Sequence, residues 1–229
     1  SEENEYDGII PVNFAGYPIN TEQLRKIADR YNLWILEDAC HSPGANYKNS
    51  EGIQQYAGNG EYSDLAIFSF HPVKHITSGE GGMITTNDKS LYEKLLMLRS
   101  HGIVKDGSTS LQNHGGWAYD MVDLGFNYRL TDFQAALGLS QLKKADKWFK
   151  RRTEIANKYD EAFKNTDIKC LKRSDGIYNA FHLYIIQVNE REKIYNILRE
   201  KNIYTQIHYI PIYKFSYYRK NGYEGISLP

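Results

Sequence analysis

The sequence predicts an α/β fold in which helices join the strands of a mostly parallel sheet. An apolar run over residues 8–14, a helical pattern over 20–31 and a second apolar run over 33–36 follow one another along the chain. This strand–helix–strand order is typical of a parallel βαβ unit. With 229 residues, 41% of them hydrophobic, the chain is long enough to bury a core as one large domain or two small ones.

The composition argues against several classes of function. Lys plus Arg and Asp plus Glu number 28 each, so the net charge is zero, whereas a nucleic-acid surface needs a basic excess or a basic face. No apolar run is long enough to cross a bilayer, so we expect no membrane partner. The two cysteines, Cys40 and Cys170, are too few for a disulfide framework and favour a cytoplasmic location.

The first half of the chain continues the alternation of strands and helices. Asn20 or Thr21 can cap the first helix, which has apolar residues at spacings of three and four. The next predicted elements are a loop over 42–63, strands over 65–70 and 83–86, a helix from 87 to about 100 and a long polar loop over 101–120. Loops of this last length are usually functional or mobile.

The second half of the chain has a different character. Thr131 is a good cap for a long helical pattern that runs from Asp132 to about Phe163. A strand over 178–188, a helix over 190–202 and a strand over 203–210 follow, which is typical of a small α+β module. We therefore expect a partial large domain over residues 1–145, and a linking helix with an incomplete small C-terminal domain over 146–229.

Polar residues follow two of the predicted strands. Asp38 and Ser69 stand at strand ends, with His41 three residues after the first and Lys74 five after the second. Ligands of parallel α/β sheets bind beyond the carboxyl ends of the strands. A carboxylate can keep a pyridine nitrogen protonated, a hydroxyl can bind phosphate, and a lysine can carry an aldehyde as a Schiff base. This is equipment for pyridoxal phosphate (PLP), although a solvated Lys74 and an Asp38 that only caps a helix remain open.

Successive residues of a strand point to opposite faces. Glu37 and Asp38 are therefore expected not to share a site. A lysine at the junction of a strand and a loop can be partly desolvated, and Lys74 could then act as a nucleophile through a lowered pKa.

Four sequence blocks give a more specific signal. They stand, in order, at residues 37–41, 68–74, 79–82 with 86–88, and 125–132. Together they resemble the signature blocks of the DegT/DnrJ/EryC1 sugar aminotransferases, and the resemblance runs from residue 8 to 229. It implies a fold-type I, PLP-dependent transferase resembling aspartate aminotransferase, with a mixed, mostly parallel sheet.

The same resemblance implies a reaction. An amino-acid donor such as glutamate would supply an amino group to a nucleotide-linked keto sugar of the UDP-4-keto-6-deoxy type. Residues 206–213 and the long loop before Gly125 most resemble the branch that makes 4-amino-4,6-dideoxy sugars for pseudaminic acid. A lysine at position 74, where the dehydratases of this family have histidine, argues against the dehydratase branch.

Individual roles follow from the resemblance. Lys74 is implied to be the Schiff-base lysine, Asp38 to pair with the pyridine nitrogen, and Ser69 to bind the phosphate. His41 is implied to lie against the ring or its phenolic oxygen. Asn127 is implied to reach the phosphate of the neighbouring subunit's cofactor, because the active sites of the family lie across a homodimer interface.

Roles in substrate binding are more open. Arg129 could serve the substrate or form an ion pair with Asp132 or another acid. His208 and Tyr209 could line the sugar pocket or pack in the core or an interface.

Other reactive residues favour structural interpretations. His71 and His75 have the spacing of a helical metal pair, but Pro72 lies between them and no second ligand pair has matching spacing, so no metal is expected. Cys40 is predicted to be a small buried residue and not a nucleophile.

The resemblance further implies that the family's amino-terminal portion is missing. That portion holds the phosphate at a helix start, which is a strong anion anchor, and it covers the cofactor ring with an aromatic residue. We therefore expect these 229 residues alone to bind PLP weakly or not at all. The alternative function is that of an inactive fragment or a non-enzymatic binding module on the same fold.

Overall fold

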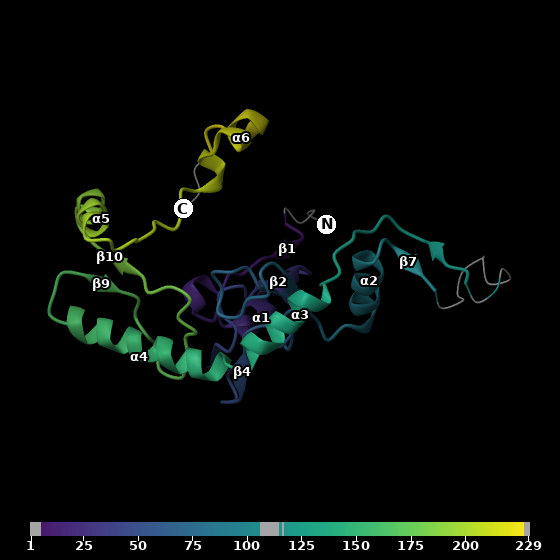
Figure 1. Cartoon of the computed structure of the whole chain (residues 1–229), viewed down its shortest axis with the longest axis horizontal. Helices are drawn as coiled ribbons and strands as arrows, with labels where there is room; N and C mark the ends of the chain where they lie inside the picture. The colour runs from purple at the N-terminus through teal and green to yellow at the C-terminus, as the bar shows by residue number, and fades with distance from the viewer. Residues whose placement is uncertain (1–5, 106–114, 116, 227–229) are drawn as a thin grey trace. The chain divides into compact units, whose positions relative to one another are not determined.

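The computed structural model describes residues 6–105, 115 and 117–226, which divide into two compact units (Figure 1). The first unit runs to Thr166 and includes Cys170–Ile185; the second comprises Asp167–Lys169 and residues from Ile186 onward. The division at residue 145 that the sequence predicts concerns the domains of the intact family fold, and it stays a prediction. The compact units of this chain keep the helix that follows residue 145 with the first unit.

The first unit is built on a four-stranded sheet in the order β1-β2-β5-β6. β1, β2 and β5 run parallel, and β6 pairs antiparallel with β5, which confirms the mixed, mostly parallel sheet. The strands are β1 (Gly8–Ile9), β2 (Trp34–Asp38), β5 (Leu65–Ser69) and β6 (Gly82–Thr85).

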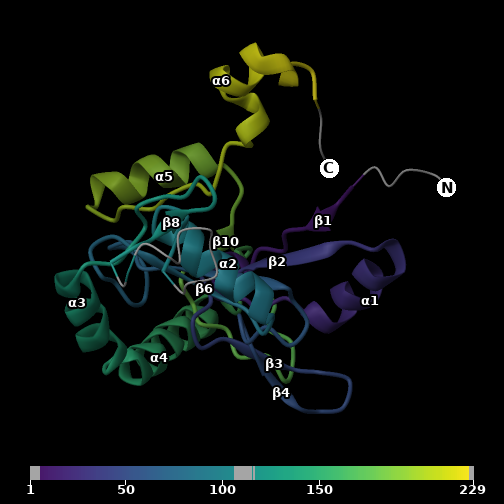
Figure 2. The same ribbon diagram turned by 90° about the vertical axis from the view of Figure 1, so that its right-hand side faces the viewer.

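The predicted βαβ unit is present, with α1 (Thr21–Tyr31) beside β1 and β2 (Figure 2). Asn20 caps this helix, because its side chain accepts a hydrogen bond from the Gln23 backbone N–H at 3.2 Å. The strand predicted over 8–14 is much shorter than expected. Pro11 has no N–H for a ladder, and the chain then turns through the short helix η1 (Phe14–Gly16).

Residues 42–63 are not the simple loop that the sequence predicts. They contain an antiparallel hairpin of β3 (Asn46–Lys48) and β4 (Gln54–Tyr56). Its strands are rich in polar residues, so they show no apolar alternation, yet Tyr47 and Gln55 are buried. The Tyr47 hydroxyl lies 2.8 Å from the Thr21 hydroxyl, which ties the hairpin to the start of α1.

The middle of the first unit follows the predicted order. α2 (Lys89–Arg99) is capped by Asp88. The predicted polar loop over 101–120 is bounded by a strand pair, because β7 (Ile103–Val104) and β8 (Asp120–Met121) pair antiparallel at its ends. Residues 106–114 and 116 of that loop lie outside the described residues.

The helix predicted from Asp132 to Phe163 is two helices, α3 (Asp132–Leu142) and α4 (Ala145–Phe163). Thr131 caps α3 in a reciprocal capping box, as the sequence predicts a cap there. The break comes at Lys144, whose backbone N–H bonds to Gln141 three residues back instead of four. The apolar pattern runs on through this tightened turn, so the sequence does not reveal it.

The predicted small module is less regular than expected. The strand over 178–188 is confined to β10 (Ile186–Gln187), and the helix is α5 (Arg191–Glu200). Residues 203–210 are not a strand, because no described segment pairs with their backbone. The remaining elements are β9 (Lys169–Cys170), η3 (Ile212–Lys214), α6 (Ser216–Tyr218) and η4 (Arg219–Tyr223). Within the described ranges, no helix has both the length and the apolar character that a membrane crossing needs.

Candidate active site

The end of β2 sends two carboxylates to opposite faces of the sheet, as predicted. Glu37 is 3% exposed, and its Oε1 accepts hydrogen bonds from Asn13 Nδ2 at 2.7 Å and from the Gly58 N–H at 3.1 Å. Burial raises the pKa of Glu37 despite these donors. Asp38 is half-buried, and its Oδ1 accepts the Cys40 N–H at 3.0 Å in a local turn. Asp38 therefore caps a turn and not a helix.

Ser69 shares a face of the sheet with Asp38. Asp38 pairs with Ile67 in the register of β2 and β5, and Ser69 is two residues further along β5, so both side chains project to the same side. Ser69 Oγ accepts the His71 N–H at 3.3 Å, which leaves the hydroxyl proton available to a ligand.

Lys74 lies in the turn that follows β5. Its backbone N–H bonds to the His71 carbonyl at 2.9 Å, and its side chain is half-buried. In the described part of the chain, its ammonium has no hydrogen bond or ion pair. This amine is therefore not committed to a structural partner.

Cys40 connects these groups electrostatically. Burial and, next, the hydrogen bond and charge of Asp38 raise the pKa of the Cys40 thiol to about 12, whereas the charge of Lys74 lowers it. Asp38 and Lys74 thus both act on one half-buried thiol, so the fold brings the ends of β2 and β5 together. Cys40 is half-buried and not buried as the sequence predicts, and its raised pKa fits the prediction that it is not a nucleophile.

His41 faces a histidine that sequence reasoning missed. Its Nδ1 accepts the Ala15 N–H at 3.3 Å, and its ring centroid lies 4.2 Å from that of His182. The His182 ring lies 5.3 Å from the ring of His75. Neither residue carried a local signal of this role, because His182 stood in a predicted strand and His75 in a predicted turn.

Both of these histidines are kept neutral. Burial, followed by the charge of Arg152, lowers the pKa of His75 to about 4. Burial, followed by the charges of His41 and His75, lowers the pKa of His182 to about 3. Lys74 contributes to the lowering of both pKa values. The candidate site is therefore rich in nitrogen bases that carry no charge near neutral pH.

The possible metal pair does not converge. His71 is exposed with its Nε2 3.8 Å from Glu80, whereas His75 is 3% exposed and its Nε2 donates to the Ala180 carbonyl at 2.9 Å. Across the residues that the structure describes, no group of three or more His, Cys, Asp and Glu side chains could hold a metal ion.

The remaining predicted residues of the first unit come from the segment between β8 and α3. Asn127 is exposed and forms a backbone bridge with Ser100. Arg129 is exposed as well, and no ion pair with Asp132 or another acid is found among the described residues. The roles of Asn127 and Arg129 stay predictions.

His208 and Tyr209 belong to the second unit, where their ring centroids are 4.4 Å apart and Tyr209 is exposed. The candidate site belongs to the first unit, so a role of these residues there also stays a prediction.

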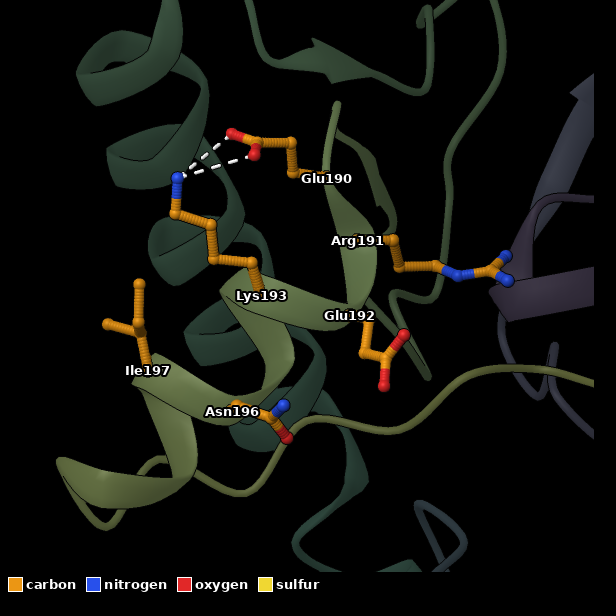
Figure 3. A pocket seen from close by; sticks show the side chains of 6 residues that line it. All are labelled: Glu190, Arg191, Glu192, Lys193, Asn196 and Ile197. Carbon is orange, nitrogen blue, oxygen red and sulfur yellow. Dashed lines mark hydrogen bonds and ion pairs between the residues drawn. The ribbon is translucent and has the colours of Figure 1, made fainter.

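A hollow in the second unit is lined by the first turns of α5 (Figure 3). Its lining residues are Glu190, Arg191, Glu192, Lys193, Asn196 and Ile197. The Lys193 ammonium lies 3.1 Å from Glu190 Oε2, and Ile197 is the one large apolar side chain of the lining. No predicted site residue lines this hollow, and its exposed charges are typical of a solvated surface.

The residues at the ends of β2 and β5 fit PLP. The site offers a carboxylate for a pyridine nitrogen, a hydroxyl proton for a phosphate and an uncommitted amine for a carbonyl carbon. These groups come from Asp38, Ser69 and Lys74, and the first two share one face of the sheet.

Comparisons with known proteins agree with this chemistry. The sequence pattern of the DegT/DnrJ/EryC1/StrS aminotransferase family matches residues 3–229. A Campylobacter jejuni UDP-4-amino-4,6-dideoxy-N-acetyl-β-L-altrosamine transaminase is 41% identical over 226 residues, which are 96% of this chain and 56% of that protein. The spore coat polysaccharide biosynthesis protein SpsC of Bacillus subtilis is 36% identical over 96% of this chain and 57% of its own length.

Solved structures are similar as well. Helicobacter pylori PseC, an aminotransferase involved in the biosynthesis of pseudaminic acid, superposes with a TM-score of 0.82 and 33% identity, over 96% of this chain and 57% of PseC. The chain thus spans a little over half the length of the relatives that it matches.

Proposed function

Because the chain belongs to the DegT/DnrJ/EryC1/StrS aminotransferase family, whose members use PLP, we propose that it carries the lysine-bearing part of a sugar aminotransferase. The amino group would pass from an amino-acid donor such as glutamate to a keto carbon of a UDP-linked 4-keto-6-deoxy sugar. The observation that supports the proposal is that Asp38 and Ser69 lie on one face at the ends of two parallel strands, with Lys74 in the turn that follows the second strand. The name of the Campylobacter relative supports the sugar class.

When bound, PLP supplies an electron sink for cleavage of bonds next to the amino carbon. Asp38 would hold the proton on the pyridine nitrogen by its negative charge. Ser69 Oγ would donate to the phosphate while it continues to accept the His71 N–H. The flat face of His41, which the Ala15 N–H orients, would lie against the ring or its phenolic oxygen.

Lys74 has two tasks in this scheme. Its amine would hold the carbonyl carbon of PLP between turnovers, and once displaced it would move a proton at the substrate carbon. Both tasks need an amine with no competing partner, and among the described residues Lys74 Nζ has none.

A cytoplasmic location remains a prediction from the cysteine content.

We also propose that the site is completed in a homodimer. Exposed large apolar side chains along residues 124–137 support this part of the proposal, with Phe133 91% and Leu124 77% exposed. Asn127, which would reach the partner's cofactor, is a residue of this stretch. Measuring the mass of the protein in solution by light scattering tests this point, and a monomer at all concentrations would contradict it.

Reductive trapping tests the cofactor assignment even when binding is weak. The protein is mixed with PLP and reduced with borohydride, and the modified lysine is located by mass spectrometry. We expect the label on Lys74, its loss in Lys74→Ala, and its retention in Lys48→Ala, an exposed lysine of the same unit. Label spread evenly over surface lysines would overturn the assignment and favour a non-enzymatic module.

The sugar assignment needs a separate experiment. Protein loaded with pyridoxamine phosphate is offered a panel of nucleotide-linked keto sugars and, in parallel, ordinary keto acids. Conversion of a UDP-4-keto-6-deoxy sugar supports the proposal. Turnover with keto acids and with none of the sugars would contradict the sugar assignment while leaving the PLP assignment intact.

A further inference from the structure

Residues 179–183, which we call the strap, are held in place by long-range hydrogen bonds. The Ala180 N–H donates to the Gly16 carbonyl at 3.0 Å, and the Leu183 N–H donates to the Ala15 carbonyl at 3.2 Å. These bonds fasten the strap to the turn that follows β1. The strap therefore belongs to the first unit, although the sequence predicts it as part of the C-terminal module.

Two side chains hold the strap through its carbonyl groups. His75 Nε2 donates to the Ala180 carbonyl at 2.9 Å. Arg152 Nη1 donates to the carbonyls of Phe181 at 2.9 Å and His182 at 3.3 Å. Side chains from the turn after β5 and from α4 thus fix the same peptide groups that carry His182.

The His182 ring of the strap lies in a row of aromatic rings. The centroid of this ring is 4.2 Å from that of His41, with 33° between the ring planes, and 5.3 Å from that of His75. His75 in turn meets the edge of Phe149 at 5.6 Å. Close-packed rings in such a row restrict each other's rotation.

The charges around this row favour neutral stacking. Lys74, Arg152 and the neighbouring histidines all disfavour protonation of His182, as does burial, and no acidic group among the described residues offsets them. His75 Nε2 must carry a proton, because a carbonyl only accepts. Its buried Nδ1 is therefore a lone pair, and it has no partner among the described residues. The cluster is organised by ring packing more than by ion pairs.

We propose that His182 is a positioning residue for His41. The hydrogen bond from Ala15 fixes one atom of the His41 ring, and the His182 face fixes the tilt of the ring about that bond. This inference rests on the proposed function, which places the same His41 ring against PLP. His182 would then act on the cofactor through His41.

A measurement without cofactor tests the packing itself. Ring protons of His41 and His182 should show a nuclear Overhauser effect in the PLP-free protein. In His182→Phe, the same effect should be seen between His41 and the phenyl ring. Its absence in a folded wild-type protein would overturn the inference whether or not the protein binds PLP.

The second measurement concerns the cofactor. We expect His182→Ala to weaken PLP binding about tenfold and to change the circular dichroism of bound PLP, because an aromatic contact of this kind contributes roughly one tenfold step. His182→Phe should stay within about threefold of wild type, since it keeps a flat ring. His101→Asn is the matched control, an exposed histidine with φ +66° where asparagine is tolerated.

The outcomes separate the two proposals. Equal PLP affinity and dichroism in wild type and His182→Ala would overturn the positioning role. Weak PLP binding by both His182→Ala and His182→Phe, with thermal unfolding unchanged, would also overturn it. The nitrogen atoms of the imidazole, and not its flat shape, would then be what the site needs. Reductive trapping that leaves Lys74 unlabelled would count against the proposed function, while the cofactor-free measurement would still decide the inference.

Discussion

The two faces of the sheet at the end of β2 differ in how completely their polar groups are satisfied. On one face, Glu37 is buried and accepts from Asn13 and Gly58, and Asn13 also donates to Ser42 Oγ at 2.9 Å. On the other face, the side chain of Asp38 makes local contacts with the N–H and the thiol of Cys40, and Lys74 Nζ has no partner in the described residues.

The difference separates stability from chemistry. A buried carboxylate with several donors is expensive to disturb, and its bonds hold together segments that are distant in the sequence. A half-buried carboxylate and an uncommitted amine contribute little to the fold, but they remain available to a ligand. Adjacent residues of one strand thus serve opposite purposes.

The largest expected effect on activity comes from Asp38→Asn. We expect the transamination rate to fall by about 10²–10³, because a neutral amide cannot hold the pyridinium proton by charge. The amide oxygen can still accept the Cys40 N–H, so the free energy of unfolding should change by less than about 0.5 kcal/mol. Single-turnover kinetics and urea unfolding measure the two quantities. An unchanged rate would mean that Asp38 serves only its turn.

Glu37→Ala should show the reverse pattern. Two buried donors, Asn13 Nδ2 and the Gly58 N–H, would lose their acceptor, so we expect a loss of about 4 kcal/mol of unfolding free energy. Glu37→Gln keeps an acceptor oxygen and should cost about 1 kcal/mol. Urea unfolding of both variants tests this, and equal losses would show that the hydrogen bonds are not the cause.

The same carboxyl group should give stability a defined pH dependence. The folded-state pKa of Glu37 is raised above its ordinary 4.5. The stabilisation that the protonated carboxyl group adds to the free energy of unfolding is therefore fully present below about pH 4.5, and it is lost as the pH rises through the folded-state pKa. A pKa that differs by one between the folded and unfolded states corresponds to about 1.4 kcal/mol. As the pH rises, the free energy of unfolding of the wild type should therefore fall relative to that of Glu37→Gln, which does not titrate at this position. A difference between the two proteins that does not change with pH would contradict this.

A smaller effect than that of Glu37→Ala is expected from Gly16→Ala, which disturbs the strap without touching a ring. Gly16 has φ +98°, and an added Cβ would lie 2.8 Å from Phe181 N and 2.9 Å from His182 N. We expect a loss of about 2 kcal/mol and a weaker His41–His182 contact. Gly52→Ala is the control, because Gly52 has a similar φ of +79° with nothing within 4 Å; it should cost about 1 kcal/mol. Equal losses would show that crowding of the strap is not important.

Local features of this protein were predictable because they are encoded within a few residues. The caps at Asn20 and Thr131 each bond to an N–H three residues ahead, and the apolar runs of β2 and β5 are contiguous. The opposite orientation of Glu37 and Asp38 follows from strand geometry alone. The blocks around Asp38 and Lys74 likewise identified the family and its cofactor.

Tertiary structure alone decided the features that depend on distant partners. His75 and Ala180 are 105 residues apart and still share a hydrogen bond, and the strap satisfies its backbone through residues 15–16 instead of a neighbouring strand. The hairpin of β3 and β4 is partly buried, but its strands are polar and give no apolar signal in the sequence. Its buried polar groups bond to distant residues such as Thr21. Nearly all buried backbone N–H and carbonyl groups of a folded chain are hydrogen-bonded, but which group bonds which is settled when the elements pack. That is why His182 carried no signal of its place beside His41.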